Sequence, residues 1–161
     1  MSTLTSAELK SPRSLITLAV FLVVVMGVGA LIGVGTAPGQ WYANLDKPPF
    51  NPPSWIFAPV WTTLYVLIAV AGWRTFLAEP NGLGMKLWYG QMALNWLWSP
   101  TFFTLHMLWP AFIVIIAIFA LILAFIFNRW DRDRIAAGLF VPYAAWVGFA
   151  SLLNLSIAAL N

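Results

Sequence analysis

The sequence of 161 residues contains no cysteine, which excludes disulfides, thiolate metal sites and a cysteine nucleophile and leaves the redox compartment undetermined. Its only histidine, His106, falls in a predicted turn, where a lone histidine is more often structural than a base or an axial ligand. Paired carboxylates, a Ser/His/Asp set and a phosphate-binding glycine loop are also missing from the sequence. We therefore predict no metal site and no catalytic residue of the conventional hydrolase or transferase type.

Charge is scarce. Charged residues make up 8% of the chain and hydrophobic residues 61%, with a mean hydropathy of +0.85, whereas soluble domains carry roughly 25% charged residues. Too few charges remain to cover a water-exposed surface, so the sequence predicts a protein whose solvent is mostly lipid. The formal net charge is +3, but the basic residues are scattered and form no patch, so nucleic acid is not an expected partner.

Long hydrophobic runs define the fold. We predict an all-α membrane protein, a five-transmembrane-helix bundle that forms a single domain over residues 1–161. The predicted helices cover residues 15–35, 55–77, 85–105, 109–128 and 135–160. Residues 1–14 are polar and predict a short, frayed tail. The run 15–35 also resembles a signal peptide, but it is longer than a typical signal core of roughly 7–15 residues, which favours a retained helix.

Proline organises the connections. The loop 36–53 is too rich in proline for a helix and is stiff for its length, so it can act as a lid over a cavity. Ser54 is a candidate N-cap for the second helix. Pro100 predicts a kink or an early softening near the end of the third helix. Pro110 fits the first position of the fourth helix, and Pro142 lies inside the fifth, where neighbouring helices can satisfy the carbonyl that it leaves free.

Basic residues predict the orientation. All but Lys47 fall at the N-terminus or near the connections after the second and fourth helices, namely Lys10, Arg13, Arg74, Lys86, Arg129, Arg132 and Arg134. The positive-inside rule then places the N-terminus in the cytoplasm and the proline-rich loop and C-terminus on the opposite side. No charge lies in the middle of a predicted span, which disfavours an ion-motive transporter.

Glycines on the first helix permit close packing. Gly29 and Gly33 form a G-x-x-x-G, which lets another helix approach closely. The alternative is that glycine is simply common in membrane helices, and the sequence leaves both readings open.

Aromatic and amide residues are the remaining functional candidates. Some of the 10 tryptophans fit an interfacial belt. Others share helix faces with polar groups, because residues three or four apart lie on one face. These sets are Trp61 with Tyr65; Gln91 with Asn95 and Trp98; and Tyr143 with Trp146, Ala150 and Asn154. Buried amides need partners, so Asn95 and Asn154 are expected to point inward. Spacing alone leaves two interpretations, a packing core joined by amide hydrogen bonds and a ligand pocket, and favours the first.

Three segments carry a family resemblance. The segment WYANLDKPPFNPPSWIFAPVWTTLY from Trp41, ALNWLWSPTFF from Ala93 and VPYAAWVGFASLLN from Val141 closely resemble the TspO/MBR family. These are the tryptophan-rich sensory proteins of bacteria and the mitochondrial translocator protein. The resemblance extends over residues 33–154, and its motifs are long and specific.

The resemblance implies a five-helix bundle, usually a homodimer, with a pocket beneath the first loop. The family binds porphyrins such as protoporphyrin IX and haem, and many members bind sterols and synthetic isoquinolines or benzodiazepines. No cofactor is required; porphyrin or haem is expected as a ligand. By position, the implied pocket residues are Trp41, Pro49, Trp61, Tyr65, Asn95, Trp146, Ala150 and Asn154. Trp98 and Tyr143 join them from spacing, and Lys47 or loop amides are candidate partners for porphyrin propionates.

Two positions depart from the family pattern. Leu155 follows Asn154 where relatives often have Tyr or Phe, and no basic residue comes after it. The proposed sterol-recognition motif is therefore absent, which disfavours sterol or lipid translocation. Pro49 stands where some relatives have an aromatic residue.

Two functions remain from the resemblance. One is a membrane sensory or translocator protein that holds a tetrapyrrole against aromatic rings. The other is light- and oxygen-dependent porphyrin breakdown, for which Trp61 and Trp146 are the candidate electron donors. The sequence does not decide between binding and chemistry.

Overall fold

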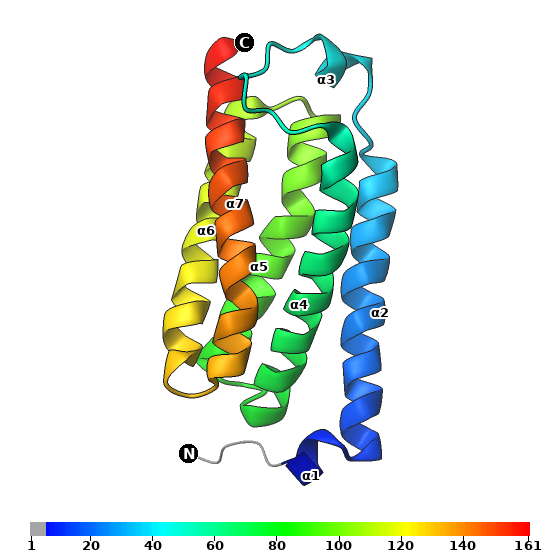
Figure 1. Cartoon of the computed structure of the whole chain (residues 1–161), viewed down its shortest axis with the longest axis vertical. Coiled ribbons are helices and arrows are strands. Elements are labelled where there is room, and N and C mark those ends of the chain that lie inside the picture. Colours follow the sequence, from blue (N-terminus) through cyan, green and yellow to red (C-terminus); the bar gives the residue numbers. More distant parts are fainter. Residues whose placement is uncertain (1–5) are drawn as a thin grey trace.

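The computed structural model describes residues 6–161, and every regular element in that range is helical. Five long helices run side by side (Figure 1): α2 (Pro12–Gly35), α4 (Phe57–Ala78), α5 (Leu83–Ser99), α6 (Leu108–Trp130) and α7 (Arg134–Leu160). The short elements are α1 (Ser6–Leu9), α3 (Gln40–Asn44), the 3₁₀ turn η1 (Ser54–Ile56) and the π-helical turn η2 (Pro100–Thr104). The predicted all-α membrane bundle is confirmed.

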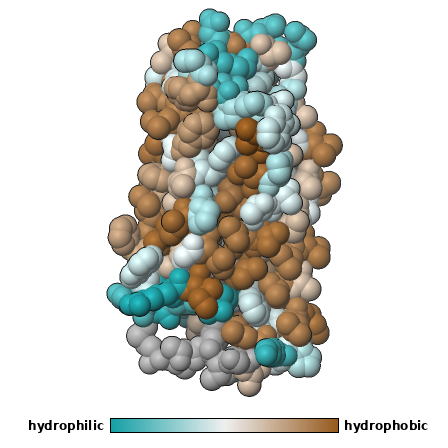
Figure 2. All heavy atoms as spheres, in the orientation of Figure 1, coloured by the Kyte–Doolittle hydropathy of each residue, from teal (hydrophilic) through white to brown (hydrophobic). Residues whose placement is uncertain are grey.

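Four of these helices are long and apolar enough to cross a membrane within the described residues, namely α2, α4 together with η1, α6 and α7. The α-helical part of α5 has 17 residues, a rise of about 26 Å at 1.5 Å per residue, and η2 extends it by one wide turn. Figure 2 shows hydrophobic surface along the visible face and hydrophilic surface gathered toward the two ends. Side chains such as Val23 and Phe127 are more than two-thirds exposed, as expected for contact with lipid.

Helix ends differ from the sequence prediction where local capping decides them. Ser11 caps α2 by accepting a hydrogen bond from the Ser14 amide, so ordered helix begins inside the segment predicted to fray. Residues 1–5 of that segment lie outside the described part. Ser54 is not an N-cap, because it opens the η1 turn and makes no capping hydrogen bond. Pro110 is the third residue of α6 rather than the first.

Pro100 widens its helix into a π-helical turn. Proline has no amide hydrogen, and beyond it the amide of Leu105 bonds to the carbonyl of Pro100, five residues earlier, at 2.9 Å. This is the predicted softening in a specific form, since π-turns commonly interrupt α-helices at functional sites.

Indole hydrogen bonds join the helices away from the lid. Trp88 Nε1 donates to the carbonyl of Ile68 at 2.9 Å, and Trp73 Nε1 donates to the carbonyl of Ser14 at 2.9 Å. Phe125 of α6 and Phe140 of α7 stack with ring centroids 4.0 Å apart. These bonds satisfy buried donors while the rings fill the core, so α2, α4 and α5 are held in register.

An ion-pair cluster closes the end of the bundle opposite the lid. Arg129, predicted to lie in a charged loop, belongs to α6, is 2% exposed and pairs with Glu79. Arg132 also reaches Glu79 at 3.2 Å, and Arg74 contacts Asp133 at 2.9 Å. The cluster therefore ties the α4–α5 connection to the α6–α7 connection.

Gly29 accommodates the ring of Tyr65 from α4, because a Cβ at Gly29 would overlap that ring. Of the two glycines in the G-x-x-x-G, Gly29 therefore serves close packing within the chain. Replacing Gly29 with alanine is expected to destabilise the fold by about 1–3 kcal/mol through overpacking. A thermal unfolding scan in detergent measures this loss.

Gly27→Ala is the matched control, since a Cβ at Gly27 meets nothing within 4 Å. It should leave the melting temperature unchanged or slightly higher, because alanine favours helix. Equal melting temperatures for the two variants would contradict the close contact at Gly29.

Candidate ligand-binding cavity

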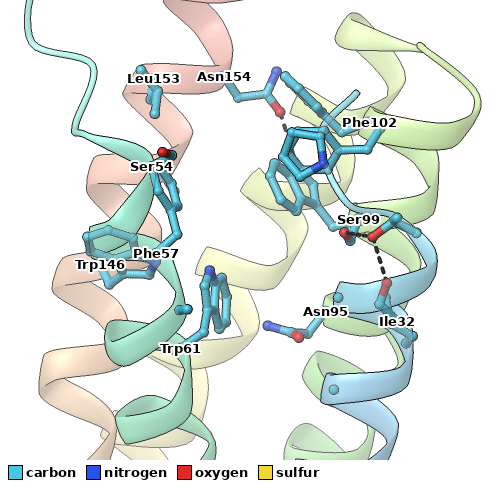
Figure 3. Close-up of a pocket in the computed structure, with 18 of the residues that line it drawn as sticks. Ile32, Ser54, Phe57, Trp61, Asn95, Ser99, Phe102, Trp146, Leu153 and Asn154 are labelled. Carbon is cyan, nitrogen blue, oxygen red and sulfur yellow. Dashed lines mark hydrogen bonds between the residues drawn. The ribbon is translucent and has the colours of Figure 1, made fainter. Parts of the chain in front are cut away.

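A cavity of about 940 Å³ lies under the loop 36–53, which forms its lid, and is bordered by α2, α4, α5, η2, α6 and α7. Apolar and aromatic side chains form most of its wall, and Figure 3 shows Trp61 and Asn95 pointing into it from α4 and α5. The sequence-predicted residues that line it are Lys47, Trp61, Tyr65, Asn95, Trp98, Trp146, Ala150 and Asn154.

Three other predicted residues do not line the cavity. Trp41, in α3 of the lid, instead stacks on His106 with ring centroids 4.0 Å apart. Tyr143 is fully buried beneath the cavity, and Pro49 is exposed on the loop. His106 has φ of 57°, a left-handed turn that only the three-dimensional backbone reveals, and this turn presents its ring to Trp41.

The floor of the cavity is a chain of hydrogen bonds. Tyr65 Oη donates to Asn95 Oδ1 at 3.2 Å, and Asn95 Nδ2 donates to Tyr143 Oη at 2.8 Å. Tyr143 in turn donates to Gln91 Oε1 at 2.9 Å, and Gln91 donates to the Trp88 carbonyl at 3.0 Å. The amide of Asn95 therefore points inward as predicted. It joins α4, α5 and α7 and at the same time borders the cavity, so the amide hydrogen bonds predicted for helix packing lie beside a cavity.

Asn154 holds the upper part of the wall. Its Oδ1 accepts from Trp98 Nε1 at 3.2 Å and its Nδ2 donates to the Leu108 carbonyl at 3.0 Å. On the other side, Trp146 Nε1 is buried and has no partner within the described residues. A buried donor without a partner is costly, so this indole N–H is available to an acceptor on a ligand.

The lid contains a short helix that the proline content did not predict. Prolines are confined to either side of α3, which leaves Gln40–Asn44 free to form one turn. Tyr42 Oη donates to Asn51 Oδ1 at 3.3 Å, and burial raises the pKa of the Tyr42 phenol above its ordinary 10.0, which keeps this donor protonated. Lys47 Nζ donates to the carbonyls of Ala43 and Leu45 at 3.1 and 2.9 Å, which folds the lid on itself.

Two contacts attach the lid to the bundle. The hydroxyls of Thr36, at the end of α2, and Ser99, at the end of α5, lie 2.6 Å apart. Asn161, at the end of α7, exchanges two 3.0 Å hydrogen bonds with the backbone N–H and C=O of Asp46. The lid is therefore fixed on both sides of the cavity.

Sequence reasoning missed several wall residues, including Phe57, Ser99 and Phe102. The spacing signal was present for two of them: Phe57 lies four residues before Trp61, and Ser99 lies four residues after Asn95, so each shares its neighbour's face. Phe102 faces the cavity through the π-turn, which spacing in an ideal α-helix does not reproduce.

Replacing Asn161 with alanine should loosen the lid. The two bonds to Asp46 are worth about 0.5–1.5 kcal/mol each, so amide hydrogen exchange over residues 40–47 should rise by about tenfold. Mass spectrometry of exchanged peptides measures it. Asn44→Ala is the control, because that exposed side chain bonds only to Gln40 within the described residues. An unchanged exchange rate in Asn161→Ala would show that the lid is held elsewhere.

Within residues 6–161 no group of three His, Cys, Asp or Glu side chains lies close enough together to hold a metal ion. The fold and the cavity define a multi-pass helical membrane protein with an internal, largely apolar cavity beneath a lid.

Comparison with known proteins identifies the family. The model of the TspO/MBR family matches residues 19–160. The chain is 38% identical to Protein CrtK of Rhodobacter capsulatus, over 92% of this chain and 94% of the relative. It is 36% identical to the tryptophan-rich sensory protein of Cereibacter sphaeroides and 35% identical to the translocator protein of Ovis aries, in each case over 84% of this chain and 85% of the relative. The chain belongs to the TspO/MBR family and is an integral membrane protein.

Proposed function

We propose that the protein binds a tetrapyrrole, protoporphyrin IX or haem, in the cavity under the lid and thereby serves sensing or transport. The observation that carries the proposal is a large cavity walled by indole and phenyl rings with one cation at its mouth. Small-molecule sites are typically ~300–1,000 Å³, mostly apolar, with a few placed polar groups. A flat, apolar macrocycle with carboxylates at one edge matches this arrangement.

Aromatic rings from two helices support stacking of a flat ligand. Trp61 lies on α4 and Trp146 on α7, and both border the cavity. Trp61 is supported by Tyr65, with ring centroids 5.4 Å apart, and Trp146 by Phe57, at 5.7 Å. Offset or edge contacts of such rings with a macrocycle add to the area that it buries.

Lys47 supports the binding of a ligand carboxylate at the cavity mouth. Its ammonium lies 4.7 Å from the centre of the Tyr42 ring and donates to two backbone carbonyls, and no carboxylate of residues 6–161 forms an ion pair with it. An ammonium has three donors. The remaining donor is free for a propionate of the ligand, in a charge-assisted hydrogen bond.

The test is a titration in lipid nanodiscs, in the dark, with protoporphyrin IX and with its dimethyl ester. Saturable binding of protoporphyrin IX is expected, and Lys47→Met should weaken it about tenfold, the lower range of a charged hydrogen bond because Lys47 is partly exposed. The ester should not respond to this substitution. Lys86→Met is the control, because Lys86 is exposed near the start of α5, at the end of the bundle away from the lid. Absence of saturable binding by the unmodified protein would overturn the proposal.

A second candidate function is light-dependent porphyrin breakdown, favoured by two indoles that border the cavity. An excited porphyrin would take one electron from Trp61 or Trp146 and pass it to dioxygen, which gives an indole radical cation and superoxide. Superoxide is then the oxidant that attacks the macrocycle and consumes the porphyrin. Protein-dependent loss of porphyrin absorbance in light but not in the dark supports this chemistry. Trp146→Phe should slow the loss; an unchanged rate removes this residue from the mechanism.

For orientation we propose that the end bearing the ion-pair cluster is cytoplasmic. The end of α4, the start of α5 and the end of α6 lie where α2 begins, away from the C-terminus (Figure 1), and these helix ends carry Arg74, Lys86 and Arg129, in agreement with the positive-inside rule. A homodimer stays a prediction from the family resemblance. Gly29 does not support it, because that glycine already packs against Tyr65 of the same chain.

A further inference from the structure

We propose that a second, external groove between α4 and α7 holds one acyl chain of a membrane lipid from the leaflet on the lid side. The groove has a volume of about 810 Å³ and lies outside the internal cavity. Residues on both of its walls, such as Pro59, Thr63 and Ala145, are exposed. The inference does not rest on tetrapyrrole binding.

The length of the groove matches one leaflet. Its α4 wall extends from Ile56 to Leu67, a rise of about 16 Å at 1.5 Å per residue. Half of a hydrocarbon core of ~30 Å is about 15 Å. Pro52, at the end of the lid, borders the groove at its outer end. The groove therefore begins at the membrane surface on the lid side and ends near the middle of the bilayer.

The surroundings of the groove are hydrocarbon. Along α7, Ile135, Val141 and Leu152 are 59%, 48% and 60% exposed, and they bracket the groove wall in sequence. In an integral membrane protein such side chains contact lipid. The molecules that reach the groove are consequently lipids.

The groove offers almost nothing to a polar occupant. Its only hydroxyl, on Thr63, already donates to the Pro59 carbonyl at 2.9 Å. Pro142 forms part of the opposite wall and has no amide hydrogen. The one other polar side-chain atom among the lining residues is the buried Nε1 of Trp146, a residue that also borders the internal cavity. A bound water needs two to four polar partners, so these walls favour an apolar chain.

The depth of the groove depends on the small side chain of Ala145 and on Trp146 behind it. Ala145 lies on the α7 wall between the larger Pro142 and Phe149, and a bigger side chain there would fill the space. At the back is Trp146, which also borders the internal cavity. A chain in the groove thus lies against a tryptophan that borders the ligand site, and lipid and ligand share that side chain as a wall.

The test uses the full chain in nanodiscs that contain phosphatidylcholine with a diazirine near the middle of one acyl chain. After irradiation, lipid adducts are mapped by peptide mass spectrometry. Adducts on residues 56–67 and 142–149 should exceed those on the lipid-facing side of α6 by about fivefold or more. Ala145→Phe should remove most of this excess, whereas Ala120→Phe, at an exposed alanine of α6 outside the groove, should leave it intact.

Equal labelling of all lipid-facing helices would overturn the proposal. So would an unchanged excess in Ala145→Phe when its melting temperature equals that of the unmodified protein. If Ala145→Phe does not fold, Thr63→Phe fills the groove from α4 and is judged by the same criterion. A protoporphyrin titration of the same variants separates the two sites, because a failure of porphyrin binding in the unmodified protein leaves the lipid map valid.

Discussion

Replacing Ala150 with phenylalanine is expected to weaken protoporphyrin IX binding by about 100-fold or more, equal to about 2.7 kcal/mol. Ala150 lines the cavity on α7, one turn from Trp146 and one turn from Asn154. A phenyl ring at this position occupies space that the macrocycle requires. The dark titration in nanodiscs measures the effect.

Ala120→Phe adds the same ring to the lipid-facing side of α6 and should leave the affinity unchanged. Melting temperatures of both variants establish that they are folded. A folded Ala150→Phe variant with unmodified affinity would place the ligand outside this cavity.

The Glu79→Gln substitution should destabilise the protein by about 3 kcal/mol. Breaking a buried ion pair typically costs ~3–5 kcal/mol because one charge is left without compensation. The low end applies here because Glu79 is 25% exposed, whereas its partner Arg129 is 2% exposed. Reversible unfolding in denaturant, or the shift in melting temperature, measures the loss.

Asp131→Asn is the matched control for Glu79→Gln. Asp131 is an exposed carboxylate in the connection between α6 and α7, at the same end of the bundle, and forms no ion pair among residues 6–161. Its substitution should change stability by less than about 0.5 kcal/mol. Equal losses in the two variants would mean that burial of Arg129 carries no special cost.

The membrane helices could be predicted from sequence because a helix that crosses lipid needs a continuous run of hydrophobic residues. Charges at the helix ends and amides on inner faces followed from the cost of burying them. Asn95 and Asn154 were accordingly placed inward, and both are hydrogen-bonded within the bundle. Each of these predictions needs only the local sequence and one physical cost, that of placing a polar or charged group in hydrocarbon.

The cavity wall was less predictable because it depends on contacts between distant segments. The resemblance implied Trp41 as a pocket residue, but the left-handed turn at His106 gives it a stacking partner outside the cavity. The sequence predicts Arg129 in a loop because a charge is rarely buried. Its ion pair with Glu79 makes burial of Arg129 tolerable. The approach of Thr36 to Ser99 joins residues 63 positions apart and has no local signature.

The most direct test of the central claim is an experimental structure of the protein in a lipid environment with saturating protoporphyrin IX. The account predicts ligand density under the lid, between Trp61, Asn95 and Trp146, with a carboxylate near Lys47. Porphyrin density only on the lipid-facing surface, with the cavity empty or closed by side chains, would contradict it.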